Sequence, residues 1–329
     1  MDVTAHLAEA ARAGASDLHL AAGQPPLLRI DGELQRLDLP ALGSNDLYQS
    51  IDPWLGEAQR RQWREGDELD LALDLPDGRR ARLNLFRQAH GPAASLRLIA
   101  STIPSLDQLD LHAVYQTVST LGDGLVIVGG PTGSGKSSTL AALIDQLNRE
   151  RPLHILTLED PIEIVHTSQR SLINQREVGR HSAGFTQALR SALRQDPDVI
   201  MLGELRDLES IRLALRAAET GHLVLATVHT RSAVSSIERL VEVFAAEEKA
   251  LVRAMLADSL RMVVAQVLVK RKGGGRVAAR EVLIGTPAVR NLIREGRLAQ
   301  VQSAMQMGAG VGMVTMEGAM ARLRERGEI

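Results

Sequence analysis

The sequence predicts a mixed α/β protein, with an α+β domain first and a larger domain built on a parallel sheet second. Two features predict this fold class. Short strands joined by tight turns dominate the first hundred residues, whereas strands and helices alternate from about residue 115. The chain has 329 residues, enough for about two domains, and its apolar content of 44% can supply a core for each.

The first domain, residues 1–100, is expected to begin with an amphipathic helix that has Val3, Leu7 and Ala10 on one side. Asp31-Gly32 lies between two strand-like runs and predicts a hairpin, because both residue types accept a positive φ. Asp77-Gly78 repeats this signal after a strand whose alternate leucines share one face. Helical residues from about 44 to 65 separate the two hairpins. Together these elements predict a small mixed α+β domain.

The second domain, residues 115–329, is predicted from apolar strands that alternate with helical segments. The strands are "GLVIVGG", "HILTLED", "DVIMLGE" and "HLVLATVHT". From about residue 233 the chain turns helical, apart from a predicted hairpin around the glycine run "KGGGR". Thr286-Pro287 opens a late helix with a capping residue followed by proline. The segment "STIPSLDQLDL" is expected to be a linker, which we place at residues 101–114.

Composition excludes several classes of protein. The sequence has 0 Cys, so disulfides and cysteine-based metal modules are excluded and a reducing compartment is expected. The formal net charge of −2 argues against a general nucleic-acid-binding protein. No apolar run reaches the ~20 residues that a membrane span needs, and the N-terminus lacks the pattern of a signal peptide. We therefore expect a soluble, cytoplasmic protein.

The segment "GPTGSGKS", residues 130–137, is a complete G-x4-GK-[ST] motif. Its glycines let the loop curl so that successive backbone N–H groups point at one anion. The following helix adds its positive end, a lysine reaches the outer phosphates, and the last hydroxyl holds Mg²⁺. The motif requires a strand before it and a helix after it, and the sequence predicts both. The chain is therefore expected to bind a nucleoside triphosphate.

Two acidic strand ends accompany this loop. "TLEDPIE" contains Glu159, Asp160 and Glu163, and "VIMLGELRD" leads to Glu204. In P-loop enzymes one acid serves the Mg²⁺ and another orients or deprotonates the attacking nucleophile. The alternative is structural, with acids that cap helices or pair with Arg206. Spacing alone does not identify the base among the three acids at 159–163.

These segments, with "GELRDLESIRLALRAAETGH" and "TVHT", resemble the P-loop, acidic box, Walker B segment and histidine box of the ATPases that drive type IV pili and type II secretion. The resemblance is closest to the PilT family of type IV pilus retraction ATPases. "GTPAVRNLIREG" resembles the AIRNLI motif of that family, with Val289 in place of isoleucine. The resemblance covers essentially the whole chain. It implies a PAS-like N-terminal domain, followed by a RecA-like P-loop ATPase domain with a helical C-terminal part.

The resemblance also implies a role for each matched residue, with ATP and Mg²⁺ as ligands. Glu163 would activate the attacking water, and Glu204 would hold Mg²⁺ together with Ser137, directly or through water. The nucleotide would be bound by the P-loop and the acidic box, through Pro131, Thr132, Gly133, Ser134, Gly135, Lys136, Ser137, Ser138, Glu159 and Asp160. Ser138 stands where threonine is common in the family, and both carry a hydroxyl.

Four further residues are implied in catalysis. His222 and His229 bracket the strand "LVLATV" and would report on the γ-phosphate or on the neighbouring subunit. The alternative for each is an ordinary polar residue at a strand end, and their spacing is not a zinc motif. Arg82 and Arg97 would reach the nucleotide of a neighbouring subunit, as arginine fingers do. The alternative is that both are solvated side chains on strands.

The implied assembly is a homohexamer that powers pilus retraction and twitching motility. Its partner would be the platform protein of the inner membrane, and a paralogous retraction ATPase is a further candidate. The missing cysteines disfavour the assembly and type II secretion ATPases, which usually carry a four-cysteine zinc module. The alternatives are a DNA or RNA translocase, which needs a basic channel and stacking aromatics, and a nucleotide-gated scaffold.

The sequence departs from the family pattern at Arg280, where histidine is frequent in the family, and the sequence does not explain this difference.

Overall fold

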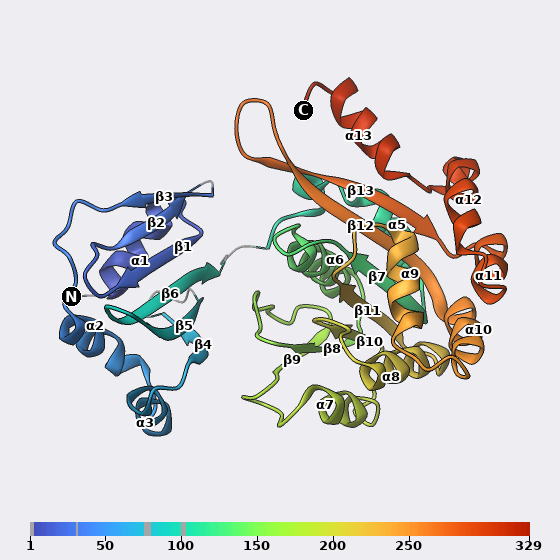
Figure 1. Ribbon diagram of the computed structural model, residues 1–329. Coiled ribbons are helices and arrows are strands. Elements are labelled where there is room, and N and C mark those ends of the chain that lie inside the picture. Colours follow the sequence, from blue (N-terminus) through green and yellow to red (C-terminus); the bar gives the residue numbers. More distant parts are fainter. Residues whose placement is uncertain (1–2, 31, 76–79, 100–102) are drawn as a thin grey trace. The chain divides into compact units, whose positions relative to one another are not determined.

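The computed structural model describes residues 3–30, 32–75, 80–99 and 103–329. The chain divides into an N-terminal unit, Met1–Thr102, and a C-terminal unit, Ile103–Ile329 (Figure 1). Each unit has hydrophobic clusters of its own. The mixed α/β class predicted from the sequence is confirmed.

The N-terminal unit contains one antiparallel sheet in the order β3-β2-β1-β6-β5-β4. The predicted hairpin at Asp31-Gly32 joins β2 to β3, with Gly32 at a φ of 90° and Asp31 outside the described residues. The predicted turn at Asp77-Gly78 also lies outside them. The strands are β1 (Asp17–Ala21), β2 (Leu27–Ile30), β3 (Glu33–Arg36), β4 (Leu69–Asp74), β5 (Arg80–Gln88) and β6 (Gly91–Ile99).

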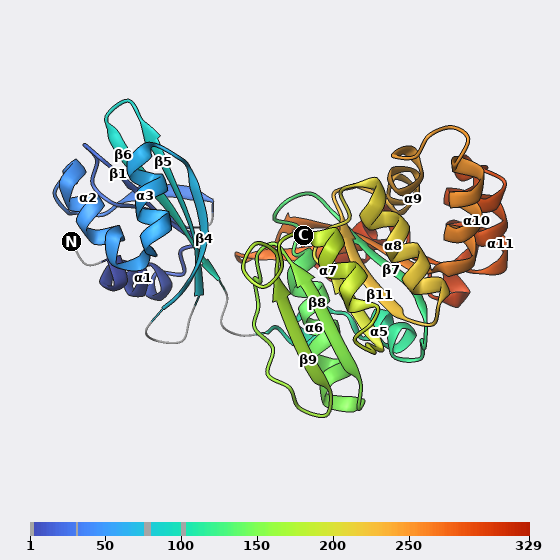
Figure 2. The same ribbon diagram turned by 90° about the horizontal axis from the view of Figure 1, so that it is seen from below.

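Helices cover one face of this sheet (Figure 2). They are α1 (Val3–Arg12), α2 (Ser44–Ile51), the 3-10 turn η1 (Asp52–Trp54) and α3 (Glu57–Glu65). Helix α1 buries Val3, Leu7 and Ala10, as its spacing predicts. Trp63 of α3 and alternate leucines of the strands complete the core. The opposite face carries the polar residues of the strands.

The C-terminal unit contains a seven-stranded sheet in the order β13-β12-β7-β11-β10-β8-β9. All neighbouring strands are parallel except the hairpin pair β12 and β13. The strands are β7 (Gly124–Gly129), β8 (His154–Glu159), β9 (Leu172–Glu177), β10 (Val199–Leu202), β11 (Leu223–Val228), β12 (Leu260–Lys270) and β13 (Arg276–Ile284). The four central strands are almost continuously buried, as strands covered on both faces must be.

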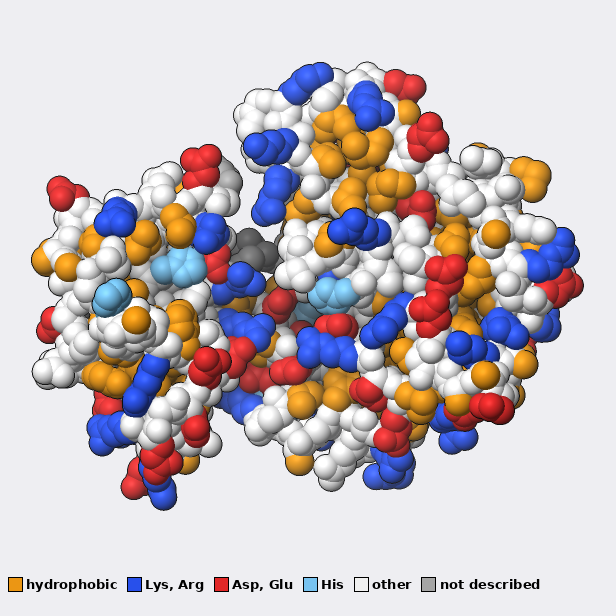
Figure 3. Space-filling view, viewed as in Figure 1, with side chains coloured by type: hydrophobic (Ala, Val, Ile, Leu, Met, Phe, Trp, Pro, Cys, Tyr) orange, Lys and Arg blue, Asp and Glu red, His pale blue; other side chains and the backbone are white. Residues whose placement is uncertain are grey.

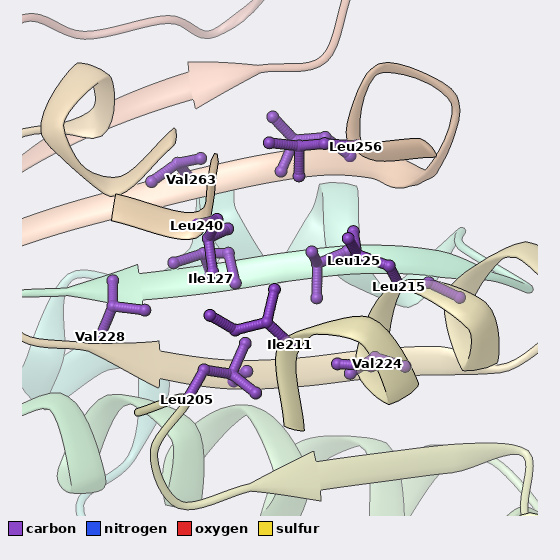
Figure 4. Packing of buried hydrophobic residues seen from close by; sticks show 14 of the residues in the cluster. Leu125, Ile127, Leu205, Ile211, Leu215, Val224, Val228, Leu240, Leu256 and Val263 are labelled. Atoms are coloured by element: carbon purple, nitrogen blue, oxygen red, sulfur yellow. The ribbon is translucent and has the colours of Figure 1, made fainter. Parts of the chain in front are cut away.

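Helices pack on both faces of this sheet. Alternate residues of β7 separate the two layers. Val126 and Val128 contact α4 (Leu106–Leu109), α5 (His112–Ser119) and α6 (Lys136–Glu150). On the other face, Leu125 and Ile127 pack with α8, α9 and α10 (Figure 4). The helices of that layer are α7 (Phe185–Ala192), α8 (Leu208–Glu219), α9 (Ala233–Glu242) and α10 (Lys249–Ser259).

The C-terminal part is helical, as predicted. It contains α11 (Pro287–Arg294), η2 (Leu298–Gln300), α12 (Val301–Met307), η3 (Gly308–Val311) and α13 (Met316–Glu325). Thr286 caps α11 with its side chain, and Val289 and Ile293 are buried. Helix α13 packs on β13 through Ala319 and Leu323. Within the part of the chain that the structure describes, no helix is both long and apolar enough to span a bilayer.

The expected linker at 101–114 differs from the structure. Ser105 caps α4 with its hydroxyl, and Leu106 and Leu111 are buried against the sheet of the C-terminal unit. Helix α5 then begins at His112. The segment from Ser105 onward is therefore folded into that unit. Its leucines are separated by polar residues, so the sequence pattern did not reveal these apolar contacts.

Candidate active site

The P-loop connects the carboxyl end of β7 to the amino end of α6. Gly130, Gly133 and Gly135 all have a positive φ, of 159°, 75° and 87°. A Cβ on Gly130 would lie 2.6 Å from the carbonyl oxygen of Gln266 and would also meet the Ser134 side chain. The first glycine of the motif is therefore required by close packing against β12 as well as by its backbone angles.

The side chain of Lys136 forms hydrogen bonds with the backbone of the P-loop. Its Nζ donates to the carbonyl oxygens of Gly130, at 2.8 Å, and Pro131, at 3.1 Å. Burial lowers the pKa of Lys136, while Glu204 and Glu163 act in the opposite direction. The two carboxylates thus lie close enough to Lys136 to interact with it electrostatically. This confirms neither of their roles, which stay predictions.

Glu204 follows β10 and lies in a chain of polar contacts. Its Oε2 is 2.8 Å from Nε of Arg206 and 3.4 Å from Nε2 of His229. The other ring nitrogen of His229 is 3.4 Å from the hydroxyl of Thr132 in the P-loop. Glu204 therefore does pair with Arg206, as the structural alternative holds. The same carboxylate also links β10 to the histidine at the end of β11, so the structure brings Glu204, His229 and Thr132 together.

The acidic box separates into one buried and two exposed acids. Glu159 is 7% exposed, and its Oε1 accepts from the Thr157 hydroxyl at 2.6 Å and the Gln175 amide at 3.1 Å. Burial raises the pKa of Glu159 to about 7, although these two hydrogen bonds oppose the shift. Asp160 and Glu163 are exposed. Burial, together with the nearby charge of Glu163, therefore favours the protonated form of Glu159.

Strand β9 supplies residues that the sequence did not single out. The buried carboxylate of Glu177 accepts from the backbone N–H of Ile162 at 3.1 Å, on one side of Glu163. The Gln175 amide donates to the carbonyl of Ile164 at 2.9 Å, on the other side. These two contacts fix the backbone that carries Glu163. The available signal was weak, since "LINQRE" has the polar pattern of an ordinary edge strand.

Three serines were also predicted to bind nucleotide or Mg²⁺. Ser137 lies in the first turn of α6 and is exposed, and Ser138 beside it is partly buried. Ser134 is buried, and its Oγ has no hydrogen-bond partner within the described residues. No cluster of three metal-ligating side chains occurs there either. Mg²⁺ at this site would therefore take phosphate and water oxygens beside Ser137 and Glu204, as Mg²⁺ commonly does.

His222 lies at the amino end of β11, whereas the P-loop lies at the carboxyl end of the neighbouring strand β7. Its Nδ1 is 3.0 Å from the carbonyl oxygen of Ala217 in α8. A strand of this length spans about 20 Å at 3.3 Å per residue. His222 therefore cannot contact a γ-phosphate held by the P-loop of its own chain. Its contact with Ala217 fits the alternative of an ordinary polar residue at a strand end, and a contact with a neighbouring subunit stays a prediction.

Arg82 and Arg97 belong to the N-terminal unit. They are direct cross-strand partners on β5 and β6 and share the polar face of that sheet. Arg82 forms an ion pair with Asp70, and Nε of Arg97 lies 2.8 Å from Oδ1 of Asp17. Each arginine thus holds a carboxylate, but the side chains of Arg82 and Arg97 are 41% and 62% exposed, so the alternative of solvated side chains stays open.

Comparison with known proteins identifies the family. A family model described as "Type II/IV secretion system protein" matches residues 1–308. The chain belongs to this family. It is 52% identical to the type IV pilus retraction ATPase PilT of Pseudomonas aeruginosa, over 100% of this chain and 96% of that protein. It is 47% identical to a twitching motility protein of Neisseria gonorrhoeae, over 92% of this chain and 82% of that protein.

A solved structure agrees with this assignment. The crystal structure of the pilus retraction motor PilT with bound ADP superposes with a TM-score of 0.91 at 43% identity. The match covers 100% of this chain and 94% of the PilT chain. The chain is therefore a PilT-family secretion ATPase, an enzyme that hydrolyses ATP. The resemblance inferred from its motifs is confirmed.

Proposed function

We propose that this protein is the motor that retracts type IV pili, using ATP hydrolysis to drive pilus disassembly and twitching motility. The observation that carries the proposal is the similarity over the full chain to a retraction ATPase. The site is consistent with it, because Glu204 and Glu163 lie within electrostatic range of Lys136 in the P-loop. Such an arrangement suits phosphoryl transfer, which depends on positioning and on neutralisation of charge.

In this mechanism the N–H groups of the P-loop and Nζ of Lys136 bind the phosphates, and Lys136 gives up its bonds to the Gly130 and Pro131 carbonyls. Ser137 and Glu204 would hold Mg²⁺, which when bound neutralises charge on the β- and γ-phosphates. Glu163, on a backbone fixed by β9, accepts a proton from the attacking water. His229, in contact with Glu204 and Thr132, is placed to respond to the γ-phosphate.

The proposed assembly is a homohexamer in which Arg82 and Arg97 contact the nucleotide of a neighbouring subunit. Each arginine would then exchange a carboxylate, Asp70 or Asp17, for phosphate oxygens. Such an exchange is chemically close, because guanidinium groups bind both kinds of anion through paired N–H donors. Any hinge between the units precedes Ser105, since the chain from there on is packed into the C-terminal unit.

The proposed partners are the platform protein of the inner membrane and, as a further candidate, a paralogous retraction ATPase. The enzyme would act from the cytoplasmic side of that membrane. A nucleic-acid translocase is not favoured by any specific observation. The net charge is −2, and acidic and basic side chains are interspersed over the C-terminal unit on the face shown in Figure 3.

The proposal is tested by complementation in Pseudomonas aeruginosa that lacks its own retraction ATPase. The wild-type gene should restore twitching zones and reduce surface pilin. Glu163→Gln and Glu204→Gln should fail while the proteins accumulate normally. The purified enzyme should hydrolyse ATP without stimulation by single-stranded DNA, and each variant should lose at least about a hundredfold in turnover. ATP hydrolysis without complementation would refute the retraction role alone, and stimulation by DNA would favour the translocase.

A further inference from the structure

Gln266 has a buried side-chain amide that lies next to the P-loop. It belongs to none of the sequence motifs that identify the family. It lies on β12 one residue beyond Ala265, whose register partner is Gly129 at the end of β7. The residue is 1% exposed, and its strand neighbours Val264, Ala265 and Val267 are apolar. Burial of an amide is unfavourable unless both of its ends form hydrogen bonds. The partners of Gln266 therefore indicate why it is polar.

Both ends of the amide are bonded to the loop and helix that hold phosphate. Nε2 of Gln266 donates to the carbonyl oxygen of Ser134 at 2.7 Å. Its Oε1 accepts from the Thr139 hydroxyl at 2.8 Å. A backbone carbonyl can only accept, so the NH₂ group must face Ser134 and the amide has one consistent orientation. Gln266 thus bridges the P-loop to the first turns of α6.

The bond to Ser134 orients a whole peptide group. A trans peptide is planar, so the Ser134 C=O and the Gly135 N–H point in opposite directions. Because the carbonyl is directed to β12, the Gly135 N–H is directed away from the sheet, toward the side on which P-loop amides bind phosphate. Gly135 has a φ of 87°, and glycine also accepts the angles of the reversed peptide. The backbone alone therefore does not fix this orientation.

We propose that Gln266 is a positioning residue for nucleotide binding, whose amide holds the Ser134–Gly135 peptide with its N–H toward the phosphates. Without that amide the buried Ser134 carbonyl loses its hydrogen-bond partner. If the peptide reverses, the carbonyl oxygen can form a hydrogen bond with water instead. The reversed peptide presents an oxygen to the phosphates and repels them. The proposal rests on the proposed ATPase function and adds to it a residue from a strand outside the catalytic motifs.

The first test replaces Gln266 by methionine, which has a similar length and volume but cannot form hydrogen bonds. We expect Gln266→Met to raise the Kd for fluorescent ADP about tenfold, since a buried hydrogen bond is worth roughly that factor. The KM for ATP should rise in parallel, while kcat at saturating ATP changes much less.

The matched control is Asn148→Leu. Asn148 is a fully buried amide on α6 that bonds Thr167 and Gln169, away from the P-loop. The Asn148→Leu variant should have a lower thermal midpoint than wild type and an unchanged Kd for ADP.

A second variant separates positioning from packing. In Gln266→Glu a neutral carboxylic acid can donate to the Ser134 carbonyl and accept from Thr139, whereas a carboxylate faces that carbonyl with like charge. ADP affinity relative to wild type should therefore be near normal at low pH and fall as pH rises. Wild type measured at each pH controls for the charged neighbours Lys136, Glu204 and Glu163, which both proteins share.

The outcomes are distinct. Unchanged ADP affinity in Gln266→Met, or a wild-type pH profile in Gln266→Glu, would refute the positioning role. If Gln266→Met does not fold, the pH profile of Gln266→Glu decides alone. Wild-type protein that bound no ADP would instead refute the nucleotide-dependent function on which the proposal rests.

Discussion

The two ends of the parallel sheet differ in how their charged side chains are paired. At the amino end, carboxylates pair with arginines of the same chain, Asp123 with Arg261 and Asp258 with Arg294. At the carboxyl end, Lys136 donates only to backbone carbonyls among its hydrogen bonds in the described chain, although Glu204 and Glu163 lie near it. At the first end these two carboxylates are thus paired within the chain. At the second end Glu204 is paired with Arg206 and His229, whereas the hydrogen bonds of Lys136 go to backbone carbonyls.

The largest expected effect is at Lys136. We expect Lys136→Met to lower kcat/KM for ATP by about a thousandfold, because it removes a cation that contacts developing negative charge. Methionine keeps the apolar stem, and the loss of a buried charge should leave the thermal midpoint unchanged or higher. Steady-state hydrolysis and thermal unfolding measure the two quantities. Turnover within tenfold of wild type would show that the carboxyl end is not arranged around a triphosphate.

Glu159 provides a test of stability against pH. Its pKa is raised from 4.5 to about 7, so between these values the folded protein retains a proton that the unfolded chain releases. Stability should therefore fall as pH rises from 4.5 to 7 and level off above that. The full effect is on the order of 3 kcal/mol at 1.36 kcal/mol per pKa unit.

Glu159→Gln should abolish this decline, because glutamine keeps an acceptor for Thr157 and Gln175 and does not ionise. Thermal midpoints of both proteins at matched pH values from 4.5 to 8 give the comparison. Parallel curves would mean that Glu159 is ionised in the folded enzyme, and it would then be a second candidate for the base.

The two histidines at opposite ends of β11 sharpen the comparison further. His229→Asn should lower kcat/KM about tenfold, the scale of one lost charge-assisted contact near the phosphates. His222→Asn should leave the Kd for ADP within about twofold of wild type, because its ring contacts Ala217 far from the loop. Labelled-ADP titration and hydrolysis assays distinguish the two. A large loss of ADP affinity in His222→Asn would require nucleotide contact across a subunit interface.

The P-loop could be predicted from sequence because its function is contiguous. Residues 130–137 carry the turn, the anion-binding amides, the lysine and the hydroxyl in one segment. The parallel sheet was predictable for a similar reason, since each strand has its own apolar run and each helix its own periodicity. Helix α1 was also predictable, because its three buried residues follow helical spacing.

Other features depend on contacts between distant segments. Gln266 is 132 residues from Ser134, and nothing in its own strand indicates what it bonds. Strand β9 contacts both Glu159 and the backbone beside Glu163, and the sequence places this strand after the acidic box without any sign of these contacts. The sequence also shows a histidine at each end of β11 and does not distinguish them, although His229 lies beside the P-loop and His222 does not. Position in three dimensions, and not residue type, separates these groups.

The smallest expected effect is at the amino end. The Asp258–Arg294 pair has an N–O distance of 2.6 Å, but its side chains are 63% and 47% exposed. Water screens such a pair, so Arg294→Met should change the free energy of unfolding by less than about 1 kcal/mol. The coupling to Asp258→Asn in a double-mutant cycle should be smaller still and should vanish in high salt. Coupling above about 2 kcal/mol would place this pair beyond the range of exposed ion pairs. The self-paired end of the sheet would then be as strictly specified as the end that binds ATP.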